Sequence, residues 1–359
     1  MINTFFFGGA APTGYSTQLA PIICGKEYYT YILKGGPGTG KSQLMKKIAE
    51  RFAKREQVTA FCCSFDPDSL DAVMLHSSRV VIVDGTPPHL QEPVFPGVCQ
   101  EIVDLGMYWD KAVLQDKREK ILEASERYRS IMTGAASQNK ALGLLCDDVY
   151  LCAEGLVDRK KIEEAARSFC DRLLNKTDRR EGRGKQTIRQ LSVMTRSGYM
   201  TLQDAAASGR DLYIVKDAWF AASGMFLDAV SAQVRDFGYD TILSPCLLSG
   251  RSFSEHLLIE GIGVALLSSN PLTRIECAGA VQIDGSAYYD KDKQQYHEKR
   301  LASDLSLIDR IAAVSRENLE DAMCVHDELE QYYIGAMDFA ALDVECERLC
   351  EEIGRRGQN

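Results

Sequence analysis

The chain has 359 residues, of which 45% are hydrophobic and 26% are charged, and its formal net charge is −9. This composition predicts a globular protein large enough for two cores, and no apolar run approaches the ~20 residues of a membrane-spanning helix. The acidic balance argues against broad nucleic-acid binding, and residues 1–7 lack the basic end of a signal peptide. We therefore expect a cytoplasmic protein whose 12 cysteines are reduced, with no membrane partner and no nucleic-acid partner.

The first predicted element is an aliphatic strand over residues 29–33, which leads through a glycine-rich loop into a helix that begins near Lys41. The loop reads GGPGTGKS and fits the P-loop pattern of Gly, four residues and Gly-Lys-Ser/Thr. Glycines let successive backbone N–H groups and the helix N-terminus point at an anion. The predicted nucleotide-binding residues are Gly35, Gly36, Pro37, Gly38, Thr39, Gly40, Lys41 and Ser42.

A second hydrophobic strand, over residues 80–83, ends at Asp84. Because α/β sheets bind ligands at the carboxyl ends of their strands, we expect Asp84 to join the Ser42 hydroxyl in the shell of a Mg²⁺ ion, while Lys41 contacts the β- and γ-phosphates. Both elements together predict binding of ATP or GTP with Mg²⁺. The letters of a guanine signature occur only at residues 175–178, in a basic linker after a helix, which favours ATP.

The residue that activates water is not at its usual place. Many ATPases carry a Glu directly after the strand Asp, where this chain has Gly85. Two candidates remain, Asp66 in the segment SFDPDSLD and His89, and with Lys41 they form the predicted catalytic set. The alternatives are a surface role for His89, and a short helix after residue 66 that begins at Asp68 or Ser69 and has Asp71 in its first turn.

The rest of the chain repeats this plan. We predict a P-loop core over residues 1–98, a helical extension rich in Lys, Glu, Leu and Ala over 99–175, a basic linker over 176–188, a second core over 189–280 and a second helical extension over 281–359. In each core, short β-rich runs alternate with helical patterns, which predicts an α/β fold with a parallel sheet flanked by helices.

Similar segments recur in the two halves, in the same order and at a nearly constant offset. The matched pairs are YILK (31–34) with YIVK (213–216), YWDK (108–111) with YYDK (288–291), and CDDVYLCAEGLVD (146–158) with HDELEQYYIGAMD (326–338). An ordered series of this kind indicates a tandem duplication. Each copy is expected to carry its own helical hairpin.

The second copy lacks the chemistry of the first. The alignment places Ser223 opposite Lys41, Gly224 opposite Ser42 and Ser268 opposite Asp84. Trp219 and Phe220 replace Pro37 and Gly38, and such large side chains either fill the phosphate space or pack as an internal interface. We therefore expect a pseudo-NTPase second half that scaffolds or completes the first site, and one nucleotide per chain.

These motifs resemble those of the uncharacterised bacterial tandem P-loop ATPases, in which two P-loop units with helical extensions share one polypeptide. The resemblance rests on YILKGGPGTGKSQLMKKI, DPDSLDAV, VVIVDGTPPH, YWDK and HDELEQYYIGAMDF, and it covers nearly the whole chain. It implies a duplicated P-loop NTPase fold and ATP binding. The chain departs from the family pattern at residues 217–224, where members of that family carry a second P-loop.

Three functions fit these features. The first is a slow, Mg²⁺-dependent ATPase that moves its helical hairpins against a protein partner, and the duplication and charge-mixed helices favour it. The second is a nucleotide or small-molecule kinase in which a hairpin is the lid and Arg118, Arg127 or Arg129 supplies cations. The third is a nucleotide-sensing scaffold that does not hydrolyse ATP. We expect either a monomer with an internal pseudo-dimer or a homodimer.

Overall fold

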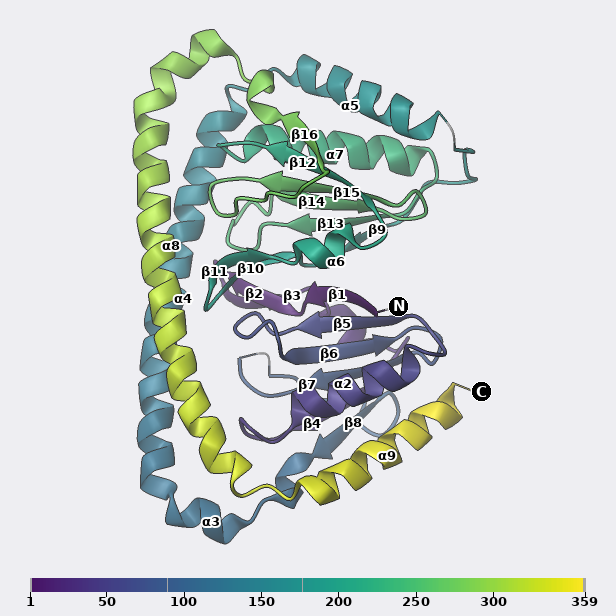
Figure 1. The fold of residues 1–359 in the computed structure, drawn as a ribbon, viewed down its shortest axis with the longest axis vertical. Coiled ribbons are helices and arrows are strands. Elements are labelled where there is room, and N and C mark those ends of the chain that lie inside the picture. Colours follow the sequence, from purple (N-terminus) through teal and green to yellow (C-terminus); the bar gives the residue numbers. More distant parts are fainter. Residues whose placement is uncertain (1, 89, 176, 358–359) are drawn as a thin grey trace. The chain divides into compact units, whose positions relative to one another are not determined.

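The computed structural model describes residues 2–88, 90–175 and 177–357, and Figure 1 shows their fold. The chain forms two compact units. Unit 1 combines residues 1–9, 15–136 and 316–359, and unit 2 combines residues 10–14 and 137–315. Among the helices of the described residues, none has the length and apolarity to cross a membrane.

Unit 1 is built on a six-stranded sheet. Its strands, in spatial order, are β1 (Ile2–Phe6), β5 (Val58–Cys62), β6 (Leu70–Leu75), β7 (Val80–Asp84), β4 (Tyr29–Lys34) and β8 (Gln100–Asp104). β1 runs parallel to β5, and β4 runs parallel to both of its neighbours. β6 runs antiparallel to both β5 and β7. Every residue of β5, β6 and β7 is buried, so these three strands form the centre of the core.

The prediction of a parallel sheet was therefore wrong, because the sheet is mixed. The alternative prediction for the segment after β5 was a short helix that begins at Asp68 or Ser69. In the structure this segment turns directly into β6 instead. A parallel return needs a crossover of a dozen or more residues, and the connection from Cys62 to Leu70 is too short for one. The turn is closed by the Ser69 N–H, which donates to the Asp66 carbonyl over 2.9 Å.

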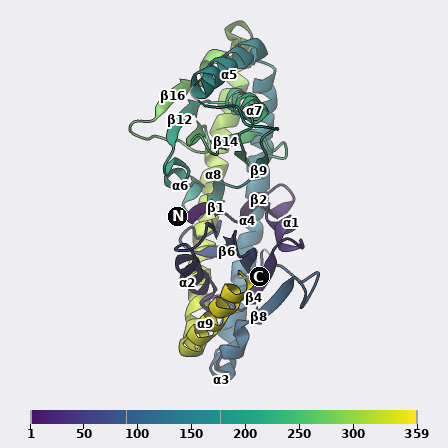
Figure 2. The ribbon, with the colours of Figure 1, turned by 90° about the vertical axis from the view of Figure 1, so that its right-hand side faces the viewer.

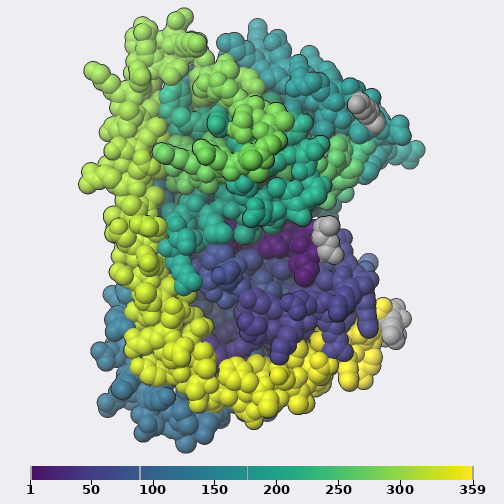
Figure 3. Space-filling view, in the orientation of Figure 1, coloured from purple at the N-terminus to yellow at the C-terminus, as the bar shows by residue number. Residues whose placement is uncertain are grey.

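Helices cover the sheet of unit 1. α2 (Lys41–Phe52) buries an apolar face made of Leu44, Met45, Ile48, Ala49 and Phe52. α9 (Phe339–Arg356) lies beside α2 (Figures 1 and 2), and in the space-filling view its yellow residues lie against the violet-blue residues of the core (Figure 3). The other helical elements of this unit are α1 (Ala20–Ile23), η1 (Leu105–Tyr108), α3 (Lys111–Asp116), the first part of α4 (Arg118–Glu154) and the last part of α8 (Lys291–Ile334).

Unit 2 contains a second six-stranded sheet with the same pattern of directions. Its strands, in spatial order, are β9 (Gln186–Ile188), β13 (Thr241–Pro245), β14 (Ser254–Ile259), β15 (Val264–Ser269), β12 (Asp211–Lys216) and β16 (Val281–Asp284). β14 is antiparallel to both neighbours, while β12 is parallel to both of its own. The helical elements are α5 (Arg159–Leu174), α6 (Gln203–Ala207), α7 (Ala221–Asp236) and η2 (Gly285–Tyr288), with the remaining parts of α4 and α8.

Two short ribbons complete the strands of the described residues. β2 (Gly8–Ala11) is hydrogen-bonded to β3 (Gly14–Thr17), and β10 (Ser192–Thr195) pairs antiparallel with β11 (Gly198–Thr201). Each ribbon follows the first strand of its half of the chain. Along the described residues, the order of elements is the same in both halves, except that α3 precedes the long helix in the first half only.

The helical extensions do not stay with the core that precedes them in the sequence. α9, which follows the second core, belongs to unit 1 and packs on α2, whereas α5, which follows the first core, belongs to unit 2 and packs on α7. Main-chain hydrogen bonds fix each exchange: the Asp338 N–H donates to the Tyr108 carbonyl over 3.0 Å in unit 1, and the Asp158 N–H donates to the Tyr288 carbonyl over 2.8 Å in unit 2. The compact units therefore cross the segment boundaries predicted from the sequence.

Candidate functional site

The glycine-rich loop, residues 35–42, lies between the carboxyl end of β4 and the start of α2. Gly38 and Gly40 have φ values of 69° and 80°, which are left-handed conformations that suit glycine. The Lys41 ammonium folds back over the loop and donates to the carbonyls of Gly35 and Gly36 over 3.0 and 2.8 Å. The predicted loop residues thus lie together at one edge of the sheet, with the lysine at the centre.

Asp84 lies beside this lysine. β7 is the neighbour of β4 in the sheet, and the register pairs Asp84 with Leu33, the penultimate residue of β4. Asp84 Oδ2 is 3.6 Å from Lys41 Nζ, and both side chains are nearly buried. The other oxygen, Oδ1, accepts hydrogen bonds from the N–H and hydroxyl of Thr86 over 2.9 and 2.6 Å. The structure thus brings the two separate sequence motifs into one ion pair.

The Ser42 hydroxyl is held at the same edge. Its oxygen accepts a hydrogen bond from the Leu70 N–H over 2.9 Å, which ties the start of α2 to the start of β6. Ser42 and Asp84 both border a cavity of about 730 Å³ in unit 1 that the glycine-rich loop also lines. Oxygen donors of these two kinds suit a hard divalent cation.

Of the residues predicted to activate water, Asp66 lines this cavity. Its carboxylate also accepts a hydrogen bond from the Ser69 hydroxyl over 2.7 Å, so it stabilises the turn between β5 and β6. His89 lies outside the described residues, and its role stays a prediction. Among the three arginines considered for a kinase lid, Arg129 lines the cavity, whereas Arg127 pairs with Glu328.

Sequence analysis missed Asp71 as a site residue. It is the second residue of β6, lines the cavity and is only 5% exposed. Burial, and then the negative charge of Asp84, raise the pKa of the Asp71 carboxyl well above its usual range. The short apolar run LDAVML was the available signal, because it suits a buried strand and would have placed Asp71 beside the strand that ends at Asp84.

A second missed group comes from the far end of the chain. His326, Asp327 and Glu330 of α8 line the same cavity, and their ligand atoms lie within 4.8 Å of one another. Glu330 Oε1 accepts a hydrogen bond from the Gly38 N–H over 3.3 Å and lies 3.9 Å from His326 Nδ1. The segment that contains these residues was noted only as part of the repeat, because nothing in a linear motif indicates which loop a distant helix will cover.

In unit 2 the corresponding loop is filled by its own side chains. The Asp217 carboxylate, 3% exposed, accepts hydrogen bonds from the N–H groups of Ser223 and Trp219 over 2.8 and 2.9 Å and from the Tyr289 hydroxyl over 2.9 Å. Phe220 is buried against Phe253, with ring centroids 5.2 Å apart. The protein therefore supplies its own anion to these amides.

The lysine–aspartate pair has an uncharged counterpart in unit 2. The Ser268 hydroxyl donates to Ser223 Oγ over 3.0 Å, at the positions that the sequence alignment gave to Asp84 and Lys41. Ser268 pairs with Val215 in the sheet, just as Asp84 pairs with Leu33. The two halves thus differ in chemistry at positions with the same placement in their sheets.

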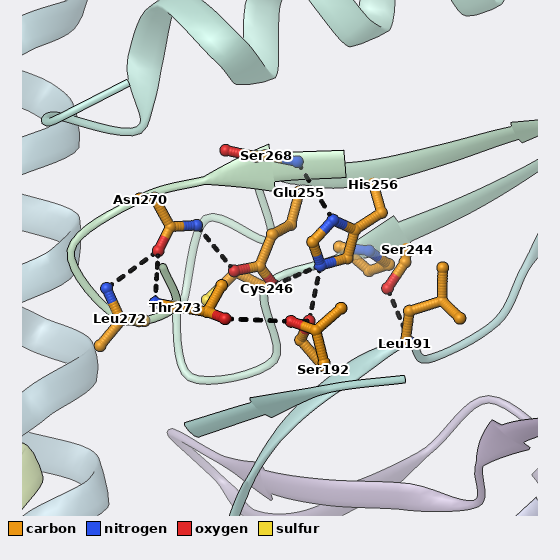
Figure 4. A network of polar contacts seen from close by, with 12 residues as sticks. Leu191, Ser192, Ser244, Cys246, Glu255, His256, Ser268, Asn270, Leu272 and Thr273 are labelled. Atoms are coloured by element: carbon orange, nitrogen blue, oxygen red, sulfur yellow. Dashed lines mark hydrogen bonds and ion pairs between the residues drawn. The ribbon is translucent and has the colours of Figure 1, made fainter. Parts of the chain in front are cut away.

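Unit 2 also contains a buried polar network around Glu255 and His256 (Figure 4). His256 Nδ1 accepts from the Ser268 N–H over 3.2 Å, so the neutral ring carries its proton on Nε2 and donates to Ser192 Oγ over 2.6 Å. Burial lowers the pKa of His256 to about 3 and raises that of Glu255 to about 7. Because the histidine donates to the serine, this group does not activate a nucleophile.

The chain matches no family model, no curated protein and no solved structure.

Proposed function

We propose that the protein is a tandem P-loop NTPase in which unit 1 binds ATP with Mg²⁺ and hydrolyses it slowly, while unit 2 is a degenerate copy that binds no nucleotide. The observation that carries the proposal is the Lys41–Asp84 pair at 3.6 Å, beside a glycine-rich loop that opens a helix and borders a cavity of about 730 Å³. The matching strand order and directions of the two sheets support a tandem duplication.

Each residue of the loop has a defined task in this proposal. The backbone N–H groups of residues 38–42 and the start of α2 bind phosphate oxygens. Lys41 would exchange its hydrogen bonds to the Gly35 and Gly36 carbonyls for contacts with the β- and γ-phosphates. Ser42 and Asp84 would hold Mg²⁺, which, when bound, neutralises the charge that develops on the transferred phosphoryl group.

In this proposal, two acidic residues that line the cavity orient or deprotonate water: Asp66 in the β5–β6 turn and Asp71 at the start of β6. Asp71 combines burial with a raised pKa, a combination typical of catalytic carboxyls. Asp66 is the more accessible of the two, because its turn lies at the end of the strands. The proposal assigns water activation to this pair, with the γ-phosphate of ATP as the electrophile.

One observation favours a kinase as the second candidate. Arg129 of α4 lines the cavity together with Lys41, so a second cation borders the same cavity. Helical lids of kinases place cations over the transferred phosphate. ADP release measured with and without a pool of acceptors separates the two functions, because only a kinase is accelerated by its acceptor.

Substitution of Lys41 tests the nucleotide site itself. We expect Lys41→Ala to abolish the rise in melting temperature that ATP and Mg²⁺ produce in the parent protein, since the ammonium is the main side-chain countercharge to the phosphates. Lys54→Ala is the matched control, because Lys54 is exposed just beyond the other end of α2. An equal thermal shift in the parent and in Lys41→Ala would overturn the site assignment.

A further inference from the structure

The glycine-rich loop of unit 1 is packed against the junction of α8 and α9, which we define as the cover segment, residues 326–342. A Cβ added to Gly38 would lie 2.7 Å from the Glu330 carbonyl oxygen, and one added to Gly36 would lie 2.9 Å from the Tyr333 ring. A Cβ on Gly40 would lie 2.6 Å from the Leu342 side chain. Glycine at these three positions therefore permits the close contact of the loop with the cover segment.

Within this contact, the Glu330 side chain accepts a hydrogen bond from a backbone N–H group that phosphate binding would require. Its Oε1 accepts from the Gly38 N–H, one of the loop amides that a nucleotide would use. A carboxylate oxygen and a phosphate oxygen cannot accept from one N–H at the same place. The negative charge of the carboxylate also repels a polyphosphate.

The loop of unit 2 contains a carboxylate of its own that occupies the loop amides. Asp217 belongs to the loop itself, is buried and accepts from two loop amides, so the anion position is permanently filled. Glu330 differs in two respects: it lies on a separate helix, and it makes a single, longer hydrogen bond to the loop. The carboxylate is thus part of the loop in unit 2 and comes from outside the loop in unit 1.

We propose that Glu330 is an internal competitor of the nucleotide phosphates, so that triphosphate binding expels its carboxylate and loosens the cover segment from the loop. This inference rests on the proposed ATP binding and adds its regulation. Two exposed ion pairs between α2 and α9, Lys47–Asp343 and Arg51–Glu347, hold the segment nearby. Exposed pairs of this kind contribute little each, so they permit local rearrangement.

Glu330→Gln tests the competition, because it removes the charge and keeps the shape. Titration calorimetry with Mg²⁺ and a slowly hydrolysed ATP analogue should show about tenfold tighter binding than in the parent protein, since phosphate no longer displaces a charged acceptor. Glu328→Gln is the matched control: it makes the same charge change on the same helix, at a residue that pairs with Arg127 outside the cavity. Its affinity should equal that of the parent.

Hydrogen exchange supplies a second measurement. The amides of residues 326–342 should exchange faster when the analogue is added to the parent, and Glu330→Gln should show raised exchange without nucleotide. Equal or weaker binding by Glu330→Gln, or slower exchange of the segment with nucleotide, overturns the inference while ATP binding stands. Absence of binding by the parent overturns the proposed function and this inference together.

Discussion

One pair of aligned positions is charged in unit 1 and uncharged in unit 2. In unit 1 these positions hold Lys41 and Asp84, 3.6 Å apart, and in unit 2 they hold Ser223 and Ser268, joined by a hydrogen bond of 3.0 Å. A buried charge that loses its partner is costly, so loss of one member favours loss of the other. The neutral pair keeps the two positions hydrogen-bonded at the sheet edge, and on the proposed function it would also remove affinity for phosphate and metal.

Asp84→Asn should retain some nucleotide binding and weaken its dependence on magnesium, because the lost carboxylate acts through the metal shell. Thermal shifts with ATP, measured over a series of Mg²⁺ concentrations, test this expectation. The variant should give a flatter response to Mg²⁺ than the parent. Identical Mg²⁺ dependence in both proteins would show that Asp84 is not part of the metal site.

Asp66→Asn or Asp71→Asn should lower turnover by on the order of tenfold or more while ATP still binds, as expected for residues that position the attacking water. His89→Ala carries the same expectation from the sequence. Steady-state ADP release, paired with calorimetry to confirm binding, separates the effects. Parental turnover in all three variants would place the activating residue elsewhere in the chain or on a partner.

The buried Glu255 predicts how pH changes stability. Its pKa is about 7 in the folded protein against an ordinary 4.5, so the unfolded chain loses this proton first as pH rises. The glutamate therefore favours folding below pH 4.5 and loses that advantage between pH 4.5 and 7, by up to roughly 3 kcal/mol. The lowered pKa of His256 has the opposite effect, because it makes the free energy of unfolding rise with pH between about 3 and 6.5. This contribution does not depend on whether residue 255 is Glu or Gln.

In Glu255→Gln the side chain of residue 255 no longer titrates. The free energy of unfolding of this variant should therefore increase relative to that of the parent as pH rises from 4.5 to 7. Urea unfolding at pH 5 and pH 7.5 measures the difference between the two proteins at each pH. A difference that is the same at both values would mean that Glu255 does not hold its proton in the folded state.

At the scale of elements, the sequence predicted the strand–loop–helix of residues 29–52 and the strand ending at Asp84, because these signals are local. It failed at β6, where a buried strand with one acidic residue resembled the first turn of a capped helix. It also could not place α8 and α9 over the glycine-rich loop, because an amphipathic helix shows that it has a partner without showing which. The lining of the cavity was therefore half predicted: the glycine-rich loop and Asp84 were identified from the sequence, whereas Asp71 and Glu330 were missed.

The filled loop of unit 2 predicts how many nucleotides one chain binds. Because Asp217 fills its amides and Phe220 is buried beside them, we expect one nucleotide per chain, bound by unit 1 alone. Titration calorimetry with a slowly hydrolysed ATP analogue gives the number of sites directly. A value near two, or binding that survives Lys41→Ala, would show that the second loop still accepts nucleotide.

At the scale of the whole molecule, the predicted halves and the compact units differ in which helices they contain. A cut of the chain between α5 and β9 separates the first core from α9 and the second core from α5, the helices that pack on α2 and α7. The apolar faces that α5 and α9 bury are then exposed on both fragments. The halves defined by the sequence repeat and the units defined by packing thus contain different helices.

We expect fragments 1–175 and 186–359 to be poorly soluble alone and to yield soluble protein only when they are produced together, because each supplies a helix that the other's core needs. Solubility and hydrogen exchange of the fragments, alone and co-expressed, test this. Two fragments that fold separately with protected cores would show that the exchanged helices contribute little to stability.

The position of the cover segment also sets an order of events during synthesis. The glycine-rich loop leaves the ribosome about 300 residues before the segment that packs on it is complete, and at about 5–20 residues per second this interval lasts roughly 15 to 60 s. For that time the nascent chain presents the loop amides without the Glu330 carboxylate. On the proposed function, ATP meets no internal competitor in this interval, so the nucleotide is a ligand of the growing chain before it is a ligand of the finished protein.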